Sequence, residues 1–495
     1  MKVMISYPPI PSEKGVPLIS QNRQFQWFNR PTFIYPVVPA YAASLLKERG
    51  YDVVWGDGVA MQMGTDDFKL FFDREKPDLI AIEAKTPVIK FYWEWVSALK
   101  KLRPGCVTVL MGDHVTAFPE EAFEHCPVDF VVTGGDFDWS LLNLANHLSK
   151  GEALEGGVYW KDPKEGVVRN SGTFKLEKNL NDNPFIDREL TRWELYSTEN
   201  GNFKYTPGTY QMAGRDCWWG KCTFCSWTTT FNNFRSVTPE RHLDEVEMLV
   251  KRYGVREIFD DSGTFPAGGW LRKFCQGLID RGLHKKVVYG CNMKPGILKQ
   301  EHWDLMGKAN FRFVLFGVES ANQQTLDRLL KGGTVEEIED TMRMAKKAGL
   351  QPHVTCMVGY PWETKRDAEN TINLTKGLFE KGYIDTLQAT IVIPYPGTPL
   401  YREAKEKGWL LTEDYNRFDM REPVMKLMEG VKYEEILKLT QGIYKSFLTP
   451  RFVLRKLASI RNLEDVKFLA MAAGRVIGHL TDFSVKQPKQ EALKI

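Results

Sequence analysis

Apolar runs and amphipathic stretches alternate along the first 150 residues of the chain. The short runs are apolar almost throughout and end at glycine or proline, which is typical of strands buried on both faces. The longer stretches between them repeat apolar residues at helical spacing. This alternation predicts a doubly wound, Rossmann-like parallel sheet that binds ligands beyond the carboxyl ends of its strands. The predicted strands lie in residues 2–9, 51–58, 77–84, 106–113 and 128–135.

A second series of the same kind begins near residue 205. Six strand-like runs alternate with amphipathic helices, two of which end at Gly282 and Gly349. This series predicts a complete or partial α/β barrel, and its six strands favour a partial (β/α)6 barrel of the TIM type, in which the chemistry lies on loops at the carboxyl ends of the strands. The runs lie in residues 209–217, 255–263, 285–295, 311–320, 350–361 and 386–399.

These patterns divide the α/β chain into four parts. Residues 1–150 form the first domain, turn-rich residues 151–200 connect it to the second, and residues 201–400 form the barrel. Residues 401–495 form a helical C-terminal domain. Within it, residues 451–480 carry an apolar stripe and more basic than acidic residues, which predicts a cap packed across the barrel mouth. A helix on a membrane surface is the alternative.

Composition indicates a folded protein of several domains. The 495 residues are too many for one ordinary core, and 43% are hydrophobic and 26% charged. A net charge of +3 is close to neutral, so nucleic acid is not an expected partner. No apolar run is long enough to span a bilayer, and the N-terminus lacks the apolar core of a signal peptide. Five scattered cysteines without paired spacing favour a reducing cytoplasm.

The other three cysteines fall within one short stretch, DCWWGKCTFCSW. Cys217, Cys222 and Cys225 have the spacing C-x4-C-x2-C and follow the first predicted barrel strand. Structural zinc takes four ligands, and no second cysteine pair is nearby, so zinc is the less favoured alternative. Thiolates are the standard ligands of iron–sulfur clusters, and the surrounding aromatic residues would shield such a cluster. Three ligands for four irons would leave one iron open to another molecule.

Polar residues gather at the ends of the other predicted barrel strands as well. Because those ends meet at one edge of a barrel, these residues and the cysteines are expected to form a common site. They are Asp260, Asp261, Ser262, Asn292, Glu319, Ser320 and the GYPWET segment, which contains Pro361.

The three-cysteine loop, with Phe224 directly before the last cysteine, resembles that of the radical S-adenosylmethionine (SAM) enzymes. Most members have C-x3-C-x2-C, and here Gly220 lies in an interval one residue longer. The resemblance implies a [4Fe–4S] cluster whose open iron binds the methionine part of SAM and which, when reduced, cleaves SAM to a 5′-deoxyadenosyl radical. It assigns to cofactor binding Phe224 and Asn292, then Asp260, Asp261 and Ser262 near the methionine amino group, Glu319 and Ser320 at the ribose, and Pro361 beside the adenine.

The first domain resembles the cobalamin-binding domain that precedes the barrel in one large subclass of these enzymes. Its MGDHVTAFPEE segment is similar to a loop of that subclass, and TGGDFDW occupies the place of a glycine-acidic loop. The D-x-H-x-x-G signature of a histidine ligand to cobalt is absent, which implies base-off, His-off cobalamin. The residues that the resemblance places at this cofactor are Pro8, Thr86, Gly112, Asp113, His114, Thr116, Gly134 and Gly135.

Down to about Tyr401, the chain is similar to the group that contains anaerobic magnesium-protoporphyrin ester cyclase and the hopanoid methylases. The resemblance implies a methyltransferase in which the adenosyl radical activates a substrate carbon and methylcobalamin supplies the methyl group. Oxidative cyclisation or C–C bond formation is the alternative among enzymes, and a non-catalytic cobalamin or redox sensor is the alternative from another class. Expected partners are a small-molecule or lipid substrate and an external one-electron reductant such as flavodoxin or ferredoxin, with peripheral membrane contact through the tail as a further option.

Overall fold

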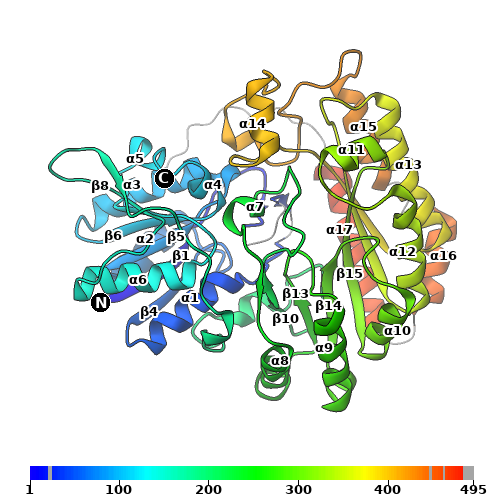
Figure 1. Cartoon of the computed structure of the whole chain (residues 1–495), viewed down its shortest axis with the longest axis horizontal. Helices are drawn as coiled ribbons and strands as arrows, with labels where there is room; N and C mark the ends of the chain where they lie inside the picture. The colour runs from blue at the N-terminus through cyan, green and yellow to red at the C-terminus, as the bar shows by residue number, and fades with distance from the viewer. Residues whose placement is uncertain (20–24, 30, 445–448, 461–462, 483–495) are drawn as a thin grey trace.

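The computed structural model describes the chain except for residues 20–24, 30, 445–448, 461–462 and 483–495. Two sheets stand side by side, each covered by helices, and further helices follow at the C-terminal end (Figure 1). The predicted α/β fold with two strand–helix series and a helical C-terminal region is confirmed.

The first sheet has the strand order β4-β1-β5-β6-β7-β8-β9. The first five of these strands run parallel, and β8 and β9 add an antiparallel edge. Residues 151–200, which the sequence predicts to connect the two domains, thus contribute β8 and β9 to this sheet. The strands are β1 (Lys2–Tyr7), β4 (Asp52–Asp57), β5 (Leu79–Glu83), β6 (Val107–Met111), β7 (Phe130–Val132), β8 (Val158–Lys161) and β9 (Val168–Asn170).

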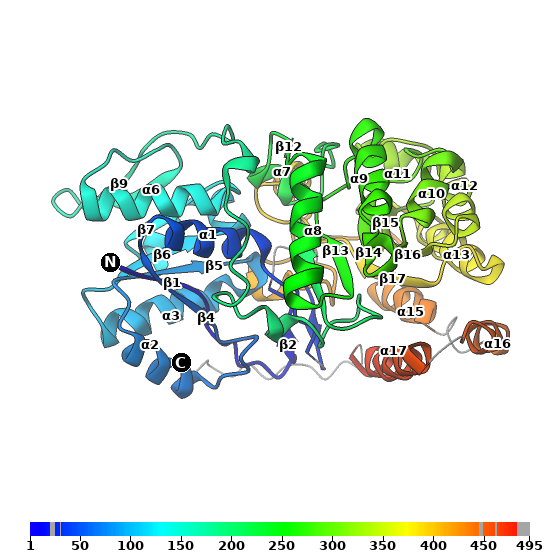
Figure 2. The ribbon, with the colours of Figure 1, turned by 90° about the horizontal axis from the view of Figure 1, so that it is seen from below.

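Helices cover both faces of the first sheet, as Figure 2 shows. Successive residues of a strand point to opposite faces, so Val3 and Ile5 of β1 join one core cluster and Met4 joins another. This burial on both faces explains why the strands are apolar throughout. The first cluster lies under α1 (Val37–Glu48) and α6 (Phe137–Lys150), and the second under α2 (Thr65–Glu75) and α3 (Ile89–Leu102).

The second sheet consists of six parallel strands in the order β10-β13-β14-β15-β16-β17. Among the described residues β10 and β17 do not pair, so the barrel is open on that side. The strands are β10 (Gly208–Gln211), β13 (Glu257–Asp260), β14 (Val288–Met293), β15 (Phe311–Glu319), β16 (Gln351–Val358) and β17 (Thr386–Ile391). The intervening helices include α8 (Pro239–Tyr253), α9 (Gly268–Asp280), α10 (Gln300–Lys308), α11 (Gln323–Arg328), α12 (Val335–Lys347) and α13 (Lys365–Lys381).

The C-terminal region contacts both ends of the barrel. At the mouth, the backbone N–H of Leu400 in α14 (Pro399–Glu406) donates to the carbonyl oxygen of Thr223 in the cysteine loop at 2.9 Å. α15 (Tyr433–Tyr444) packs against α13 and β17.

α17 (Leu463–Asp482) lies at the opposite end of the barrel from the mouth. Its Asp465 pairs with Lys204, and the guanidinium of Arg312, at the amino end of β15, lies 5.6 Å from the ring centroid of Phe468. The prediction that residues 451–480 cap the barrel mouth is therefore wrong for the described part of this helix. Charged residues at the amino ends of the strands supply its partners.

The two sheets meet through the loops at their carboxyl ends. α4 (Asp113–Ala117), which follows β6, packs against α7 (Trp227–Thr230) in the cysteine loop. Gly135, which follows β7, lies so close to Phe231 that a Cβ atom on it would stand 2.2 Å from the ring. The ligand side of the first sheet thus faces the cysteine loop.

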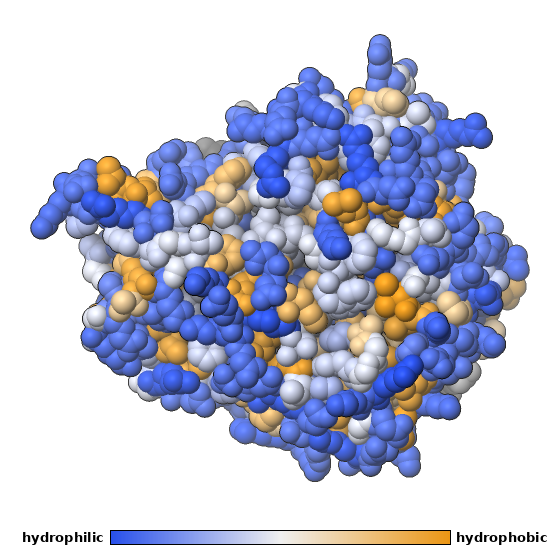
Figure 3. All heavy atoms as spheres, in the orientation of Figure 1, coloured by the Kyte–Doolittle hydropathy of each residue, from blue (hydrophilic) through white to orange (hydrophobic). Residues whose placement is uncertain are grey.

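No helix in the described part of the chain is both long and apolar enough to cross a membrane. The face shown in Figure 3 is mostly hydrophilic, with apolar residues in separate patches. Several of the exposed large apolar side chains belong to α16 (Pro450–Ala458) and the first turns of α17. They are Val453, Leu454, Leu457, Leu463 and Val466.

The Gly135→Ala substitution should destabilise the junction between the sheets. A methyl group 2.2 Å from the Phe231 ring forces the ring or the backbone to move, which we expect to lower the free energy of unfolding by about 1–3 kcal/mol. Gly105→Ala is the matched control, because nothing lies within 4 Å of its Cβ position. Denaturant titration of both variants tests this expectation, and equal stability of the two would contradict it.

Candidate functional site

The three cysteines line one cavity at the carboxyl ends of the barrel strands. The backbone of Cys217 forms an isolated β-bridge with Thr264, which lies beyond the end of β13. All three cysteines are partly exposed. The cavity encloses about 1220 Å³ of empty space including its mouth. Its lining also includes Trp219, Phe224, Asp261, Asn292, Lys294, Glu319, Lys331, Thr355, Thr390 and Tyr395.

Side-chain contacts hold the cysteine loop in place. The Sγ atom of Cys217 lies 3.2 Å from the hydroxyl of Thr264, and the indole N–H of Trp219 donates to the carbonyl oxygen of Leu330 at 2.8 Å. Burial raises the pKa of the Cys222 thiol to about 11, and the ammonium of Lys331 acts in the opposite direction. The Cys222 thiol is therefore the one shown to be shielded from water, and a cation lies near it.

Glu319 presents a carboxylate to the same cavity from the end of β15. Its backbone φ of 66° is unusual for a residue other than glycine, and such strain is often found at functional sites. The ammonium of Lys331 donates to Oε1 of Glu319 at 2.7 Å, and this pair is largely buried. Asp261 and Asn292 line the cavity from the ends of β13 and β14.

Three other predicted SAM-binding residues have their side chains engaged within the protein. Asp260 accepts a hydrogen bond from the backbone N–H of Ala213 at 2.8 Å, and the hydroxyl of Ser262 accepts one from Gly214 at 2.9 Å. The hydroxyl of Ser320 donates to Glu363 at 2.8 Å. These three, and Pro361, are not among the residues that line the cavity. Their assignment to SAM stays a prediction.

The predicted cobalamin residues come together at the carboxyl edge of the first sheet. The hydroxyl of Thr116 donates to the carbonyl oxygen of Gly112 at 2.6 Å and accepts from the N–H of Gly134 at 3.1 Å, which ties two strand-end loops together. Gly112 has φ of +123° and packs on Ala84, so only glycine fits there. Pro8 follows β1 at the same edge, and Asp113 begins α4.

His114 is buried, and both of its ring nitrogens have partners. Nδ1 lies 3.1 Å from the hydroxyl of Thr86, and Nε2 lies 2.9 Å from a carboxylate oxygen of Glu121. The other oxygen of that carboxylate accepts from Tyr415 at 3.1 Å. His114 is thus a buried, hydrogen-bonded residue of α4 in this structure, as expected for a domain without a histidine ligand to cobalt.

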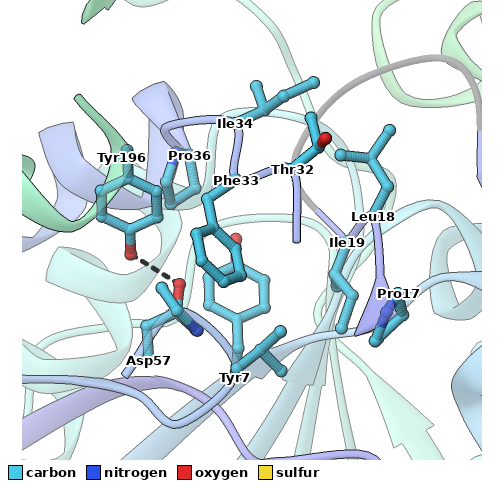
Figure 4. Close-up of a pocket in the computed structure, with 12 residues that line it drawn as sticks. Tyr7, Pro17, Leu18, Ile19, Thr32, Phe33, Ile34, Pro36, Asp57 and Tyr196 are labelled. Atoms are coloured by element: carbon cyan, nitrogen blue, oxygen red, sulfur yellow. Dashed lines mark hydrogen bonds between the residues drawn. The ribbon is translucent and has the colours of Figure 1, made fainter. Parts of the chain in front are cut away.

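A second, smaller pocket opens at the ends of β1 and β4 (Figure 4). The hydroxyl of Tyr196 donates to Asp57 at 2.5 Å, and the hydroxyl of Tyr7 donates to Glu83 at the end of β5. Burial raises the pKa of Asp57 to about 6 and that of Glu83 to about 7. These carboxyl groups therefore change charge near neutral pH.

Among the residues of the main cavity that sequence patterns missed are Thr264, Lys331 and Tyr395. Lys331 and Thr264 contact Glu319 and Cys217, and only the fold brings them there. Tyr395 belongs to the IPYPGTPLY segment, and its buried hydroxyl has no hydrogen-bonding partner among the described residues. Burial raises the pKa of Tyr395, and nearby Asp113 raises it further, so this tyrosine lies where the cavity approaches the first domain. The position of Lys331 twelve residues after Glu319 gave no signal by itself.

Among the described residues, no three His, Cys, Asp or Glu side chains converge closely enough to hold a single metal ion. The three thiols instead lie around the wall of the cavity. Fold and site together define an α/β-barrel protein with three thiols at its strand ends and a second α/β domain facing them.

Comparison with known proteins identifies the family. A family model described as the radical SAM superfamily matches residues 213–375. An uncharacterized methyltransferase of Pyrococcus horikoshii is 30% identical over 429 residues, which cover 85% of this chain and 89% of that protein. The chain therefore belongs to the radical SAM superfamily.

Further matches share most of the chain. The anaerobic magnesium-protoporphyrin IX monomethyl ester cyclase of Rubrivivax gelatinosus is 26% identical over 434 residues, covering 85% of this chain and 75% of that protein. Among solved structures, the cobalamin-dependent SAM radical enzyme OxsB matches with a TM-score of 0.70 and 14% identity over 97% of this chain and 71% of its own. The radical SAM methyltransferase TsrM of Kitasatospora setae matches with a TM-score of 0.65 and 15% identity over 82% of this chain and 75% of its own. These two structures share the fold.

The Glu83→Gln substitution should make the chain relatively more stable as the pH rises. Because burial raises the pKa of Glu83 from 4.5 to about 7, the stability that its neutral form supports is fully present below about pH 4.5 and is lost as the pH rises through 7. Glutamine does not titrate, so the difference in unfolding free energy between variant and parent should grow by about 2–3 kcal/mol from pH 5 to pH 8.

Denaturant titrations at pH 5 and pH 8 measure this difference. Glu177→Gln serves as control, because that side chain is exposed. A difference for Glu83→Gln that does not change with pH would contradict the assigned pKa.

Proposed function

We propose that the chain is a cobalamin-dependent radical SAM methyltransferase. One observation carries this proposal: three thiols, the Glu319–Lys331 pair and Asn292 line a single cavity at the ends of the barrel strands. The cysteine loop beside this cavity packs against the carboxyl edge of the first sheet. The similarity to a methyltransferase and to solved cobalamin-dependent enzymes supports the same proposal.

The donor set of the main cavity fits an iron–sulfur cluster with SAM. Cys217, Cys222 and Cys225 would hold the cluster, and thiols spread around a cavity wall suit a group wider than one ion. Glu319 would accept hydrogen bonds from the ribose hydroxyls of SAM, since a buried carboxylate is a strong acceptor. When bound and reduced, the cluster supplies the electron that cleaves SAM.

The edge of the first sheet fits a cobalamin bound without a histidine ligand. Both ring nitrogens of His114 are occupied, and the loops that carry Thr86, Gly112 and Thr116 converge at this edge. The Tyr395 hydroxyl, which has no partner within the part of the chain that the structure describes, lies near Asp113 between this edge and the cysteines, where a bound molecule would satisfy it. When bound, cobalamin supplies the methyl group.

The protein's own contribution is to orient its ligands and to exclude water. Trp219 and Phe224 of the cysteine loop line the cavity beside the thiols and would keep water from them. Leu400 of α14 is hydrogen-bonded to the same loop. The barrel interior offers apolar walls with the hydroxyls of Thr355 and Thr390, which suits a substrate that is largely apolar with few polar groups. The substrate is a small molecule or a lipid in this proposal.

Oxidative cyclisation is the second candidate, and the similarity to the magnesium-protoporphyrin ester cyclase over 85% of the chain favours it. Methylation adds one methyl group to the substrate, whereas ring closure removes hydrogens, so product mass separates the two. A non-catalytic cobalamin or redox sensor would bind cofactor and yet form no 5′-deoxyadenosine under reduction.

An external one-electron carrier such as flavodoxin or ferredoxin would supply the electrons for the reaction. The eight free thiols of the chain suit a reducing cytoplasm.

Anaerobic reconstitution with iron, sulfide and hydroxocobalamin tests the proposal. We expect the parent chain to show cluster and cobalamin absorbance, to form 5′-deoxyadenosine with SAM and reductant, and to give a methylated product in cell extracts. Cys222→Ala should lose the cluster and 5′-deoxyadenosine while keeping cobalamin, and Cys275→Ala, outside the cysteine loop, is the control. Zinc in place of iron in the parent, or unchanged turnover in Cys222→Ala, would overturn it.

We further propose that α16 and the start of α17 contact anionic membranes. These helices lie along one edge of the molecule in Figure 2, and Leu454 and Leu463 are 66% and 68% exposed. Arg451 and Lys467 are exposed on the same helices. Both acidic residues in the first turn of α17 are paired with basic residues, Glu464 with Arg256 and Asp465 with Lys204, so the exposed side chains named here are apolar or cationic.

Sedimentation with vesicles of mixed phosphatidylglycerol and phosphatidylcholine tests this surface. The double variant Leu454→Gln/Leu463→Gln should bind about 10-fold more weakly than the parent, because two apolar side chains no longer enter the bilayer. Leu70→Gln is the control, since Leu70 is 70% exposed on α2 of the first domain. No binding by the parent, or equal loss in the control, would refute membrane contact.

A further inference from the structure

The cysteine loop begins and ends in a short hairpin. β11 (Gly214–Arg215) precedes the loop and pairs antiparallel with β12 (Arg235–Ser236), which follows it. Residues 216–234, with all three cysteines, lie between these two strands. Arg215 stands directly opposite Arg235 in the pairing. Side chains that bind these two arginines therefore fix both ends of the cysteine loop.

Two aspartates of the first domain hold them. Asp136 and Asp138 follow β7 in the TGGDFDW segment. The guanidinium of Arg215 donates to Asp138 at 2.9 and 2.6 Å and to Asp136 at 3.1 Å. Arg235 donates to both oxygens of Asp136 at 2.7 and 2.8 Å. One carboxylate of the first domain thus bridges the two strands that flank the cysteines.

This ionic cluster is deeply buried. Arg215 is 2% exposed, Asp136 5% and Asp138 0%. Buried charges are tolerated only with full, well-oriented partners, and the two-pronged arginine–carboxylate contact has a narrow geometric range. Arg215 also packs on the ring of Tyr41 in α1, at 5.6 Å from its centroid, and Asn183 donates to Asp138 at 2.8 Å. A shift of either loop end would therefore break charged contacts in a buried setting.

The sequence pattern of this acidic loop predicts cobalamin binding at Gly134 and Gly135, and the geometry gives the carboxylates that follow them partners within the protein. Gly134 and Gly135 pack against Phe174 and Phe231, and the carboxylates beyond them face arginines. The two aromatic contacts and the three ion pairs all connect this loop to other parts of the protein. The loop joins the first domain to the cysteine loop.

We infer that Asp136 and Asp138 are positioning residues, which set the placement of the iron–sulfur ligands by clamping both ends of the cysteine loop through Arg215 and Arg235. The inference rests on the proposed cluster. On this inference the first domain supports the metal site. A displacement of Asp136 or Asp138 would move the two arginines and, through them, the ends of the loop that carries the three thiols.

Iron release from the reconstituted full chain tests the inference. We expect Asp136→Asn to lose iron to a ferrous chelator about 10-fold faster than the parent, as is typical when a group that supports metal ligands is removed. The electron paramagnetic resonance signal of the reduced cluster should change as well. Arg235→Lys keeps the charge but loses the two-pronged contact, so it should show the same change in weaker form.

A matched control separates positioning from general destabilisation. Glu257 and Arg312 form an equally buried ion pair at the amino end of the barrel, far along the strands from the cysteines. Glu257→Gln should lower the melting temperature yet keep the parent's iron release and resonance signal.

Iron release at the parent's rate from both Asp136→Asn and Arg235→Lys would overturn the inference, and so would equally fast release from Glu257→Gln. If Asp136→Asn does not fold, Arg235→Lys decides. A parent chain that takes up no iron would instead refute the proposed function, and the inference with it.

Discussion

Parallel strands all end at the same edge of their sheet, and in this molecule two such edges are turned toward each other. Loops from β6 and β7 of the first sheet reach α7 and Phe231 in the cysteine loop of the second. Since the ligand-binding positions of parallel sheets lie at this edge, the two candidate sites are neighbours. The close packing of Gly135 against Phe231 is one of the contacts that bring the two edges together.

Buried charge gives the junction its specificity. Apolar contacts alone tolerate small sliding movements, whereas the arginine–aspartate cluster at Arg215 requires particular distances and angles. The Glu319–Lys331 pair acts similarly inside the cavity, where it holds a carboxylate in a strained backbone conformation. In both places burying the charged groups costs free energy, and their paired geometry fixes the position of the side chains. This is typical of sites that must hold reactive partners apart from water.

Much of the fold and part of the site could be predicted from the sequence. The apolar runs of β1 and β13 are local patterns, and so is the three-cysteine spacing. Asp261, Asn292 and Glu319 were found because strand ends share an edge. Asp260 and Ser262 occupy the same edge, but their side chains accept hydrogen bonds from the backbone of Ala213 and Gly214, which follow β10, and no local pattern indicates which way a side chain turns.

The sequence by itself determined the class of fold, the order of its elements and the family, because periodicity and cysteine spacing are local properties. Tertiary structure alone decided the rest. It placed α17 at the amino end of the barrel, where Asp465 finds Lys204, and it turned the acidic loop after β7 toward Arg215. Partners of this kind are separated by tens to hundreds of residues. Their pairing depends on which surfaces meet when two sheets pack, and that is a property of the whole chain.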